Sequence, residues 1–160
     1  VLVLVARPAD LPGVVERLRS LDLDPIPERD PADEPLRIEV TYNGPDLLDV
    51  ADHLGVTDTE VVRRHTSQVW TVEFTGFAAG FGYLTGAENG LDVPRRADPR
   101  TRIPAGSVGL AGPYSGVYPR DSPGGWQIIG RTADPMWDPT RDPPALLTPG
   151  REVRFVQVER

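Results

Sequence analysis

Four arginines lie close together in one short segment bounded by prolines. The segment runs from Pro94 to Pro104 and contains Arg95, Arg96, Arg100 and Arg102. A guanidinium group binds carboxylates and phosphates through two parallel hydrogen bonds, so several such groups aimed at one point would recognise an anion. The alternative is that these side chains pair with some of the 24 acidic residues on a loop surface, where each ion pair contributes little. The residues alone leave both interpretations open.

A turn follows the arginines directly, at Pro104-Ala105-Gly106-Ser107. Such a turn would present the Ser107 hydroxyl and consecutive backbone N–H groups to a phosphate or an oxyanion. However, the chain contains neither a GxxxxGK[ST] nor a GxSxG motif. On the residues alone, a tight turn that leads into a strand is the better explanation.

His65 is the histidine that is best placed to do chemistry, because it lies at the end of a predicted helix beside Thr66. Histidine is the usual general base near neutral pH and can also sense a substrate through hydrogen bonds. The alternative is a structural role at the helix end, where an imidazolium interacts favourably with the helix dipole. His53 falls on a predicted exposed helix face and receives no role. With no carboxylates at ligand spacing, the two histidines predict no metal site.

Aromatic residues alternate with glycines in the second half of the chain. Eleven of the 16 glycines fall between Gly76 and Gly125, and glycine permits positive φ or the close approach of a ligand to the backbone. Aromatic residues are more often core than ligand-binding, yet tyrosine and tryptophan also line pockets. The candidates are Phe77, Phe81, Tyr83, Tyr114, Tyr118 and Trp126. Together with the arginines, they favour a site built from shaped loops.

The elements that must position these residues are mostly short strands. Apolar runs predict strands near residues 36–42, 69–75, 107–110, 127–129 and 152–158. Two short helices are predicted: one ends at Gly55, and the other begins with a capping box from Thr57 to Glu60. Short strands separated by Gly/Pro turns predict a mainly β (α+β) fold with a closed or partly closed β-barrel.

The first 35 residues have a different character. Residues 1–5 are typical of a buried strand, and residues 10–18 of an amphipathic helix with Asp10 as its cap and Pro12 in its first turn. Residues 22–35 are rich in proline and acidic residues and predict a linker. The chain begins within the apolar strand and without a methionine. We therefore expect residues 1–30 to be the remnant of an N-terminal α/β domain with its linker, and residues 36–160 to be the barrel domain.

Composition excludes several classes of function. A formal net charge of −7 argues against nucleic-acid binding, which requires a basic face. No run approaches the ~18 apolar residues of a membrane span, and no signal peptide is present. The absence of cysteine excludes disulfides, thiolate nucleophiles and cysteine-based metal sites. A cytoplasmic protein with no membrane partner is the expectation.

Taken in order, these motifs resemble the family variously called allophanate hydrolase subunit 1, KipI and the PxpB subunit of 5-oxoprolinase. The matching residues are His65-Thr66, Gly76-Phe77, Gly80-Phe81, Tyr83-Leu84, Pro94-Arg95-Arg96, Pro99-Arg100, Pro104-Ala105-Gly106-Ser107-Val108, Tyr118-Pro119, Ser122-Pro123-Gly124-Gly125-Trp126 and Ile129-Gly130-Arg131-Thr132. The match covers about residues 36–158. Ala79 stands where the family pattern has proline, and Ile103 replaces a valine.

The resemblance implies a small α/β domain followed by a cyclophilin-like β-barrel with two short helices. It also implies ATP-dependent opening of the 5-oxoproline lactam to glutamate, together with two partners: an allophanate hydrolase subunit 2-like protein and a LamB/YcsF-type subunit. ATP would be held by the complex, and the chain would be inactive alone. Phosphorylation of the lactam carbonyl would make it labile, which requires cations and a dry pocket but no serine or cysteine nucleophile.

On this basis we predict His65 and Ser107 as catalytic residues. The predicted substrate-binding and anion-binding residues are Arg95, Arg96, Arg102, Gly106, Phe81, Tyr83, Tyr118, Gly125 and Trp126. Two alternatives stay open: a KipI-like regulatory protein that binds and inhibits a histidine kinase, and a carboxyltransferase subunit of the allophanate hydrolase or urea carboxylase type. The chain has no biotin-attachment motif, so in the second case biotin would come from a partner.

Overall fold

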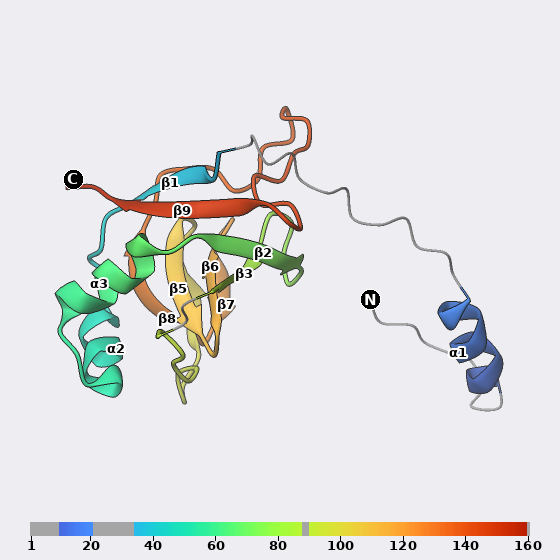
Figure 1. The fold of residues 1–160 in the computed structure, drawn as a ribbon, viewed down its shortest axis with the longest axis horizontal. Helices are drawn as coiled ribbons and strands as arrows, with labels where there is room; N and C mark the ends of the chain where they lie inside the picture. Colours follow the sequence, from blue (N-terminus) through green and yellow to red (C-terminus); the bar gives the residue numbers. More distant parts are fainter. Residues whose placement is uncertain (1–9, 21–33, 88–89, 160) are drawn as a thin grey trace.

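The fold is mainly β, as predicted, and is dominated by a nearly closed seven-stranded barrel (Figure 1). The computed structural model describes residues 10–20, 34–87 and 90–159. In order around the barrel, the strands are β1 (Leu36–Val40), β9 (Glu152–Gln157), β2 (Trp70–Thr75), β3 (Gly82–Gly86), β6 (Tyr114–Val117), β5 (Ser107–Ala111) and β8 (Gln127–Arg131). A separate two-stranded sheet is formed by β4 (Arg100–Ile103) and β7 (Ser122–Gly124). Within the barrel, β1 and β9 are parallel and the other neighbouring pairs are antiparallel.

The barrel closes through a single bridge between its two outermost strands. Thr41, directly after β1, donates its backbone N–H to the Arg131 carbonyl at 2.9 Å, and the Arg131 N–H donates to the Thr41 carbonyl at 3.0 Å. Beyond this bridge the chain continues along β8. The Gly44 N–H donates to the Ile129 carbonyl at 3.1 Å. The segment after β1 therefore runs along β8, from its last residue back toward its first.

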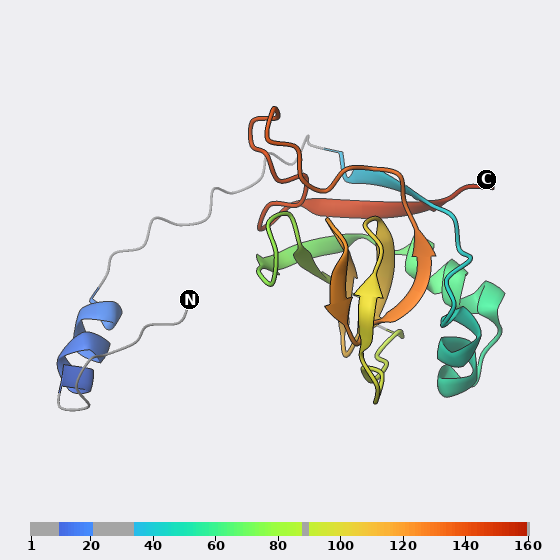
Figure 2. The same cartoon turned by 180° about the vertical axis from the view of Figure 1, so that it is seen from behind.

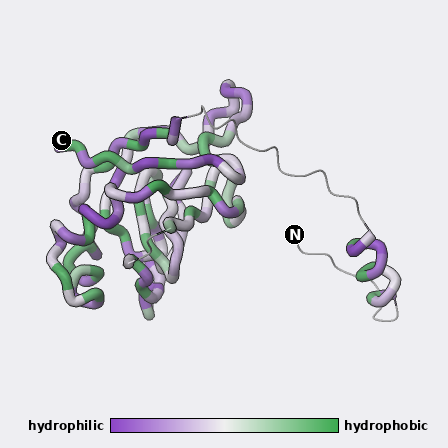
Figure 3. Tube along the Cα trace, viewed as in Figure 1, coloured by the Kyte–Doolittle hydropathy of each residue, from purple (hydrophilic) through white to green (hydrophobic). Residues whose placement is uncertain are grey.

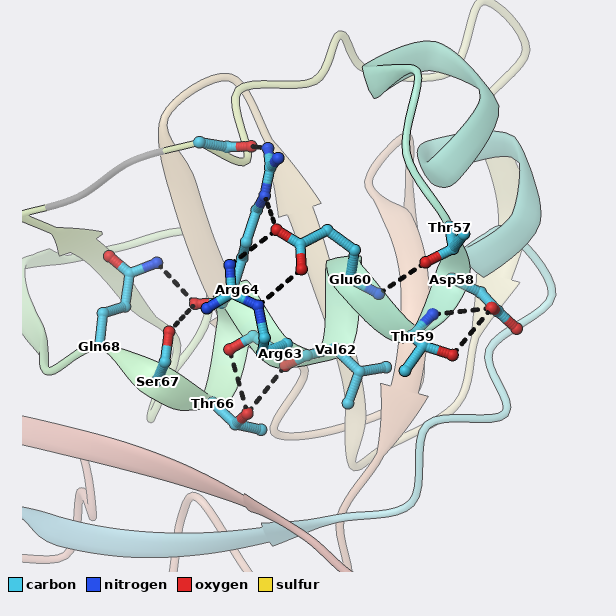
Figure 4. Close-up of polar contacts among 11 residues, drawn as sticks. Thr57, Asp58, Thr59, Glu60, Val62, Arg63, Arg64, Thr66, Ser67 and Gln68 are labelled. Carbon is cyan, nitrogen blue, oxygen red and sulfur yellow. Dashed lines mark hydrogen bonds and ion pairs between the residues drawn. The ribbon is translucent and has the colours of Figure 1, made fainter.

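Two of the helices pack together at one end of the barrel (Figure 1 and Figure 2). Helix α2 (Leu47–Leu54) ends at Gly55, whose φ of 65° lies in the left-handed region. Helix α3 (Asp58–Ser67) begins at Thr57, which accepts a hydrogen bond from the Glu60 N–H at 3.1 Å (Figure 4). Both boundaries confirm the predicted helix ends. Of the predicted capping box only the Thr57 half forms, because the Glu60 carboxylate pairs with Arg63 and Arg64 instead.

The third described helix, α1 (Leu11–Arg19), lies where the amphipathic pattern predicts one. Proline is in its first turn, but the Asp10 side chain makes no capping hydrogen bond. None of its residues is buried. The predicted strand at residues 1–5 and most of the predicted linker lie outside the described residues, so the division into two domains stays a prediction. In the part of the chain that is described, no helix is long and apolar enough to cross a membrane.

The buried residues form two clusters, one on each face of the barrel sheet. Successive residues of a strand point to opposite faces. Thus Leu110 and Ile129 belong to the large cluster, whereas their neighbours Ala111 and Ile128 belong to the small one. Ile103 of β4 joins the small cluster, so the β4–β7 sheet covers this face. Figure 3 shows hydrophobic and hydrophilic positions interspersed along the barrel strands, as this division requires.

His65 lies in the barrel core rather than at a surface. Its ring is fully buried, with Nδ1 2.7 Å from the Tyr42 hydroxyl and Nε2 2.8 Å from the Ser115 hydroxyl. The ring stacks on Phe155, and the Trp70 indole N–H donates to the His65 carbonyl at 2.9 Å. Burial lowers the pKa of His65 to about 3, so the ring is neutral at pH 7.

This position fits neither of the predicted roles of His65. Both ring nitrogens are engaged inside the protein, so the ring cannot contact a ligand as a general base. A neutral ring also cannot supply the positive charge predicted at the helix end. The sequence places a histidine in the last turn of α3, but it does not show that this turn enters the core.

His65 should make the protein sensitive to mild acid. Its pKa is about 6.5 in an unfolded chain and about 3 in the folded one, so protons bind preferentially to the unfolded chain between these values. The stability due to neutral His65 is fully present above pH about 6.5 and is lost as the pH falls, with a limiting slope of about 1.4 kcal/mol per pH unit. Denaturant unfolding between about pH 5 and pH 7 should therefore give a flatter pH dependence for His65→Gln than for wild type.

The exposed His53 provides the matched control. His53→Gln should keep the wild-type pH dependence. Equal slopes for wild type and His65→Gln would contradict the prediction.

Candidate functional site

The predicted site residues are distributed over several places in the structure. His65 is in the barrel core. Arg102 and Ser107 line a cavity of about 460 Å³ at the closure of the barrel, hereafter the closure cavity. A second, much smaller cavity of about 70 Å³, hereafter the aromatic cavity, is lined by Arg95, Phe81, Tyr83, Tyr118, Gly125 and Trp126. Most of the predicted residues thus fall into two separate groups, whereas His65, Arg96 and Gly106 line neither cavity.

The closure cavity combines cationic and neutral polar groups. Its polar lining comes from Arg100, Arg102, Arg131, Ser107 and Asn43. The Ser107 side chain is buried, yet its hydroxyl makes no hydrogen bond to another described residue. A carboxylate or phosphate with an adjacent polar group would find complementary partners here. Arg100 and Arg131 were not among the predicted site residues.

The turn before Ser107 is held tightly, as the residues alone suggested. Gly106 has a φ of 79°, and a Cβ there would collide with the Thr132 carbonyl oxygen. The Gly106 N–H donates to the Tyr118 carbonyl at 2.8 Å, and the Ser107 N–H to the Pro104 carbonyl at 3.2 Å. These backbone donors are therefore engaged within the protein and do not form the predicted oxyanion cradle. Only the Ser107 hydroxyl stays available.

Asp121 fixes the same turn from outside. Its carboxylate accepts from the Ala105 N–H at 2.9 Å and from the Arg102 Nε–H at 2.7 Å. These two bonds, the one from Ala105 first, lower the pKa of Asp121. The pair is exposed, so it contributes little to stability. Arg102 thus belongs to an exposed ion pair and at the same time lines the closure cavity.

The most buried charge near the closure cavity belongs to Asp46, which the sequence reasoning missed. Its residue exposure is 1%. It accepts from Arg96 Nη1 at 2.7 Å, from Arg100 Nη1 and Nη2 at 2.8 and 2.7 Å, and from the Ile128 N–H at 2.6 Å. Burial by itself raises the pKa of Asp46, but the bonds from Arg100 and Ile128, with the charges of both arginines, outweigh it. The net pKa lies below the usual value.

Asp46 reaches this place because the segment after β1 follows β8. The Gly44 backbone approaches Ile128 and Ile129 so closely that a Cβ would collide with their backbone. The Asp46 N–H then donates to the Ile128 carbonyl at 3.0 Å. In sequence, an aspartate directly before a helix resembles an N-cap. The available signal was that clustered arginines need an acidic partner, but 24 acidic residues offer no unique choice.

Ring-to-ring contacts build the aromatic cavity. Phe81 contacts Tyr118 and Trp126 edge to face, with ring centroids 5.3 and 5.2 Å apart. Burial is the largest influence on Tyr118 and raises its pKa to about 12. Arg95, at the rim, is exposed and makes no hydrogen bond or ion pair with another described residue. These aromatic residues are mostly core, as the simpler interpretation held, and the space they leave is too small for more than a carboxylate-sized group.

The neighbouring turn also contains the departure from the expected family pattern. Phe77 has a φ of 66°, which is uncommon for a bulky residue, and its side chain is exposed. Ala79, where the pattern has proline, is exposed in the same turn. Among the described residues, no cluster of three or more histidine, aspartate or glutamate side chains is arranged to hold a metal ion.

Comparison with known proteins places this geometry in a family. The carboxyltransferase domain, subdomain C and D, matches residues 1–147. The PxpB subunit of 5-oxoprolinase from Escherichia coli O157:H7 is 44% identical, over 96% of this chain and 82% of that protein. The crystal structure of TTHA0988 has a TM-score of 0.75 at 37% identity over 92% of this chain. This chain spans 28% of the TTHA0988 chain.

More distant structures support the fold alone. The Kluyveromyces lactis urea carboxylase has a TM-score of 0.67 at 22% identity, over 78% of this chain and 14% of that one. This likeness agrees with the mainly β architecture found here. The family model and the close relative together settle the assignment: this chain belongs to the carboxyltransferase domain, subdomain C and D, family and, within it, to the PxpB proteins of 5-oxoprolinase.

Proposed function

We propose that this chain is a subunit of an ATP-dependent 5-oxoprolinase, which hydrolyses the lactam of 5-oxoproline to glutamate. It acts with an allophanate hydrolase subunit 2-like protein and a LamB/YcsF-type subunit. Membership of the PxpB family of 5-oxoprolinase subunits supports an enzyme-complex role.

The observation that carries the proposal is the closure cavity, where three arginines lie near an unpartnered serine hydroxyl. 5-Oxoproline carries one carboxylate and one secondary lactam. We place its carboxylate against Arg131 and Arg100, because guanidinium groups bind carboxylates through paired hydrogen bonds. The Ser107 hydroxyl would then hydrogen-bond the lactam. The Pro104–Ser107 turn lies at the same wall and keeps this hydroxyl in place.

The chemistry on this substrate requires activation, because an unstrained amide is a poor electrophile. ATP supplies it: the lactam carbonyl oxygen takes the γ-phosphoryl group and ADP leaves. Water then adds to the carbon and the ring C–N bond breaks, which leaves the acyl phosphate of glutamate. A second water hydrolyses this acyl phosphate and releases phosphate and glutamate. The cationic side chains of this chain would bind the substrate and stabilise negative charge near the carbonyl. This sequence lacks a phosphate-binding loop motif, so we place the nucleotide on another subunit.

Removing one cavity cation should weaken substrate binding. In the reconstituted complex, Arg131→Gln should raise the KM for 5-oxoproline by about tenfold, the typical effect of a lost charge-assisted hydrogen bond. Ser107→Ala should raise KM less and lower kcat, if its bond strengthens as charge develops. Steady-state kinetics measure both.

The exposed Arg154 on β9 does not line the closure cavity and provides the matched control. Arg154→Gln should leave both constants within about twofold of wild type. Unchanged kinetics in Arg131→Gln and Ser107→Ala would remove the closure cavity from the proposal.

The complex itself is the second test. ADP release should require 5-oxoproline, this chain and both partner subunits together, and should be absent when any one is omitted. ADP release that is independent of 5-oxoproline, or full turnover without this chain, would contradict the proposal. Inhibition of histidine kinase autophosphorylation by this chain alone would favour the KipI-like alternative instead.

A further inference from the structure

The buried carboxylate of Asp46 and its two arginines form a single charged group. Arg96 and Arg100 both contact Asp46 at 2.7 Å, and each arginine is less than one-third exposed. One negative and two positive charges leave the group with a net charge of +1. Arg100 also lines the closure cavity, so this charge is presented at the cavity wall.

We propose that Asp46 is a positioning residue for anion binding, which fixes the Arg100 guanidinium in the orientation that the closure cavity needs. This inference deepens the proposed function and rests on it for the identity of the anion, 5-oxoproline carboxylate. Asp46 itself does not line the cavity.

The hydrogen-bond count supports a fixed orientation. An ionised carboxylate has about four acceptor sites, and Asp46 receives four bonds, so none is left unused. Arg100 gives Asp46 one N–H from each of its two terminal nitrogens. A guanidinium has five N–H donors in a rigid plane, so with two of them bound to Asp46 the directions of the other three are fixed as well.

The charges support the same role. Without a carboxylate between them, the neighbouring guanidinium groups of Arg96 and Arg100 would repel each other and turn toward solvent. A carboxylate between them holds both, and still leaves one positive charge for an anion. A single arginine paired with a single aspartate would leave none.

Asp46 does not cap helix α2 in the usual way. It occupies the N-cap position of α2, where an aspartate side chain normally accepts a stabilising hydrogen bond from the first turn. Its side chain makes no such bond and turns to the arginines instead. Stability alone does not explain the arrangement well, because buried ion pairs are often no better than apolar packing.

Asp46→Asn separates positioning from simple electrostatics. The substitution raises the formal charge of the group from +1 to +2, so a pure charge effect would tighten anion binding. However, asparagine has an NH2 group in place of one carboxylate oxygen, and this group cannot accept hydrogen bonds from the guanidinium N–H donors. The orientation of Arg100 is then lost. Positioning therefore predicts an increase of about tenfold in the KM for 5-oxoproline in the reconstituted complex, with kcat little changed. Partial unfolding would instead lower the apparent kcat at constant KM.

Glu60→Gln is the matched control. Glu60 also pairs with two arginines, Arg63 at 2.6 Å and Arg64 at 2.8 Å, but on α3 and away from the closure cavity (Figure 4). This variant should leave KM unchanged. If Asp46→Asn does not fold, Arg100→Lys provides the test of the positioning role. It keeps the positive charge but cannot form the two parallel hydrogen bonds of a guanidinium group. Positioning predicts a similar increase in KM, whereas charge alone predicts less than about threefold.

A direct titration separates this inference from the proposed function. Chemical-shift titration of the full chain with 5-oxoproline, and separately with inorganic phosphate, reports anion binding without turnover. Absence of 5-oxoproline hydrolysis by the complex would overturn the proposed function only. Equal or tighter anion binding by Asp46→Asn, or no binding of either anion by wild type, would overturn the positioning role.

Discussion

The structure depends on how its barrel closes. β1 and β8 are joined by one pair of backbone hydrogen bonds, between Thr41 and Arg131. Past this pair, the segment after β1 stays hydrogen-bonded to β8 through the backbone N–H groups of Gly44 and Asp46, and Gly44 allows the close approach. The closure cavity lies beside this stretch, lined from one side by residues 43–45 and from the other by Ile128 and Arg131.

The buried polar groups differ in charge between the two faces of the barrel sheet. Inside the barrel, the neutral His65 ring is hydrogen-bonded to the hydroxyls of Tyr42 and Ser115. The core therefore contains polar atoms without charge. Outside, between the barrel and the β4–β7 sheet, the one deeply buried carboxylate among the described residues is compensated by two arginines. This buried ionised group therefore lies on the side on which an anionic ligand would be bound.

Much of the fold could be predicted from the sequence, but the site could be predicted only in part. Alternating apolar residues indicated five strands, and Gly55 and Thr57 indicated two helix boundaries, because these signals are local. Strands β3, β4, β6 and β7 were missed, since glycine, serine and arginine interrupt the apolar period. Arg102 and Ser107 were found, but not Asp46 or Arg131. Their roles depend on contacts across 50 residues or more, such as Arg96 with Asp46, which no spacing reveals.

The openness of the closure cavity bears on why such a chain would need partners. Arg102 and Arg131 are exposed, and in water a guanidinium attracts a carboxylate only weakly because the solvent screens both charges. Arg100 is better placed, since Asp46 orients it and the protein covers most of its side chain. The remaining cations would bind tightly only if water were excluded, and another protein of the complex seated over the cavity would do this. On the proposed function, activity then requires assembly for an electrostatic reason, in addition to any residues that the partners contribute.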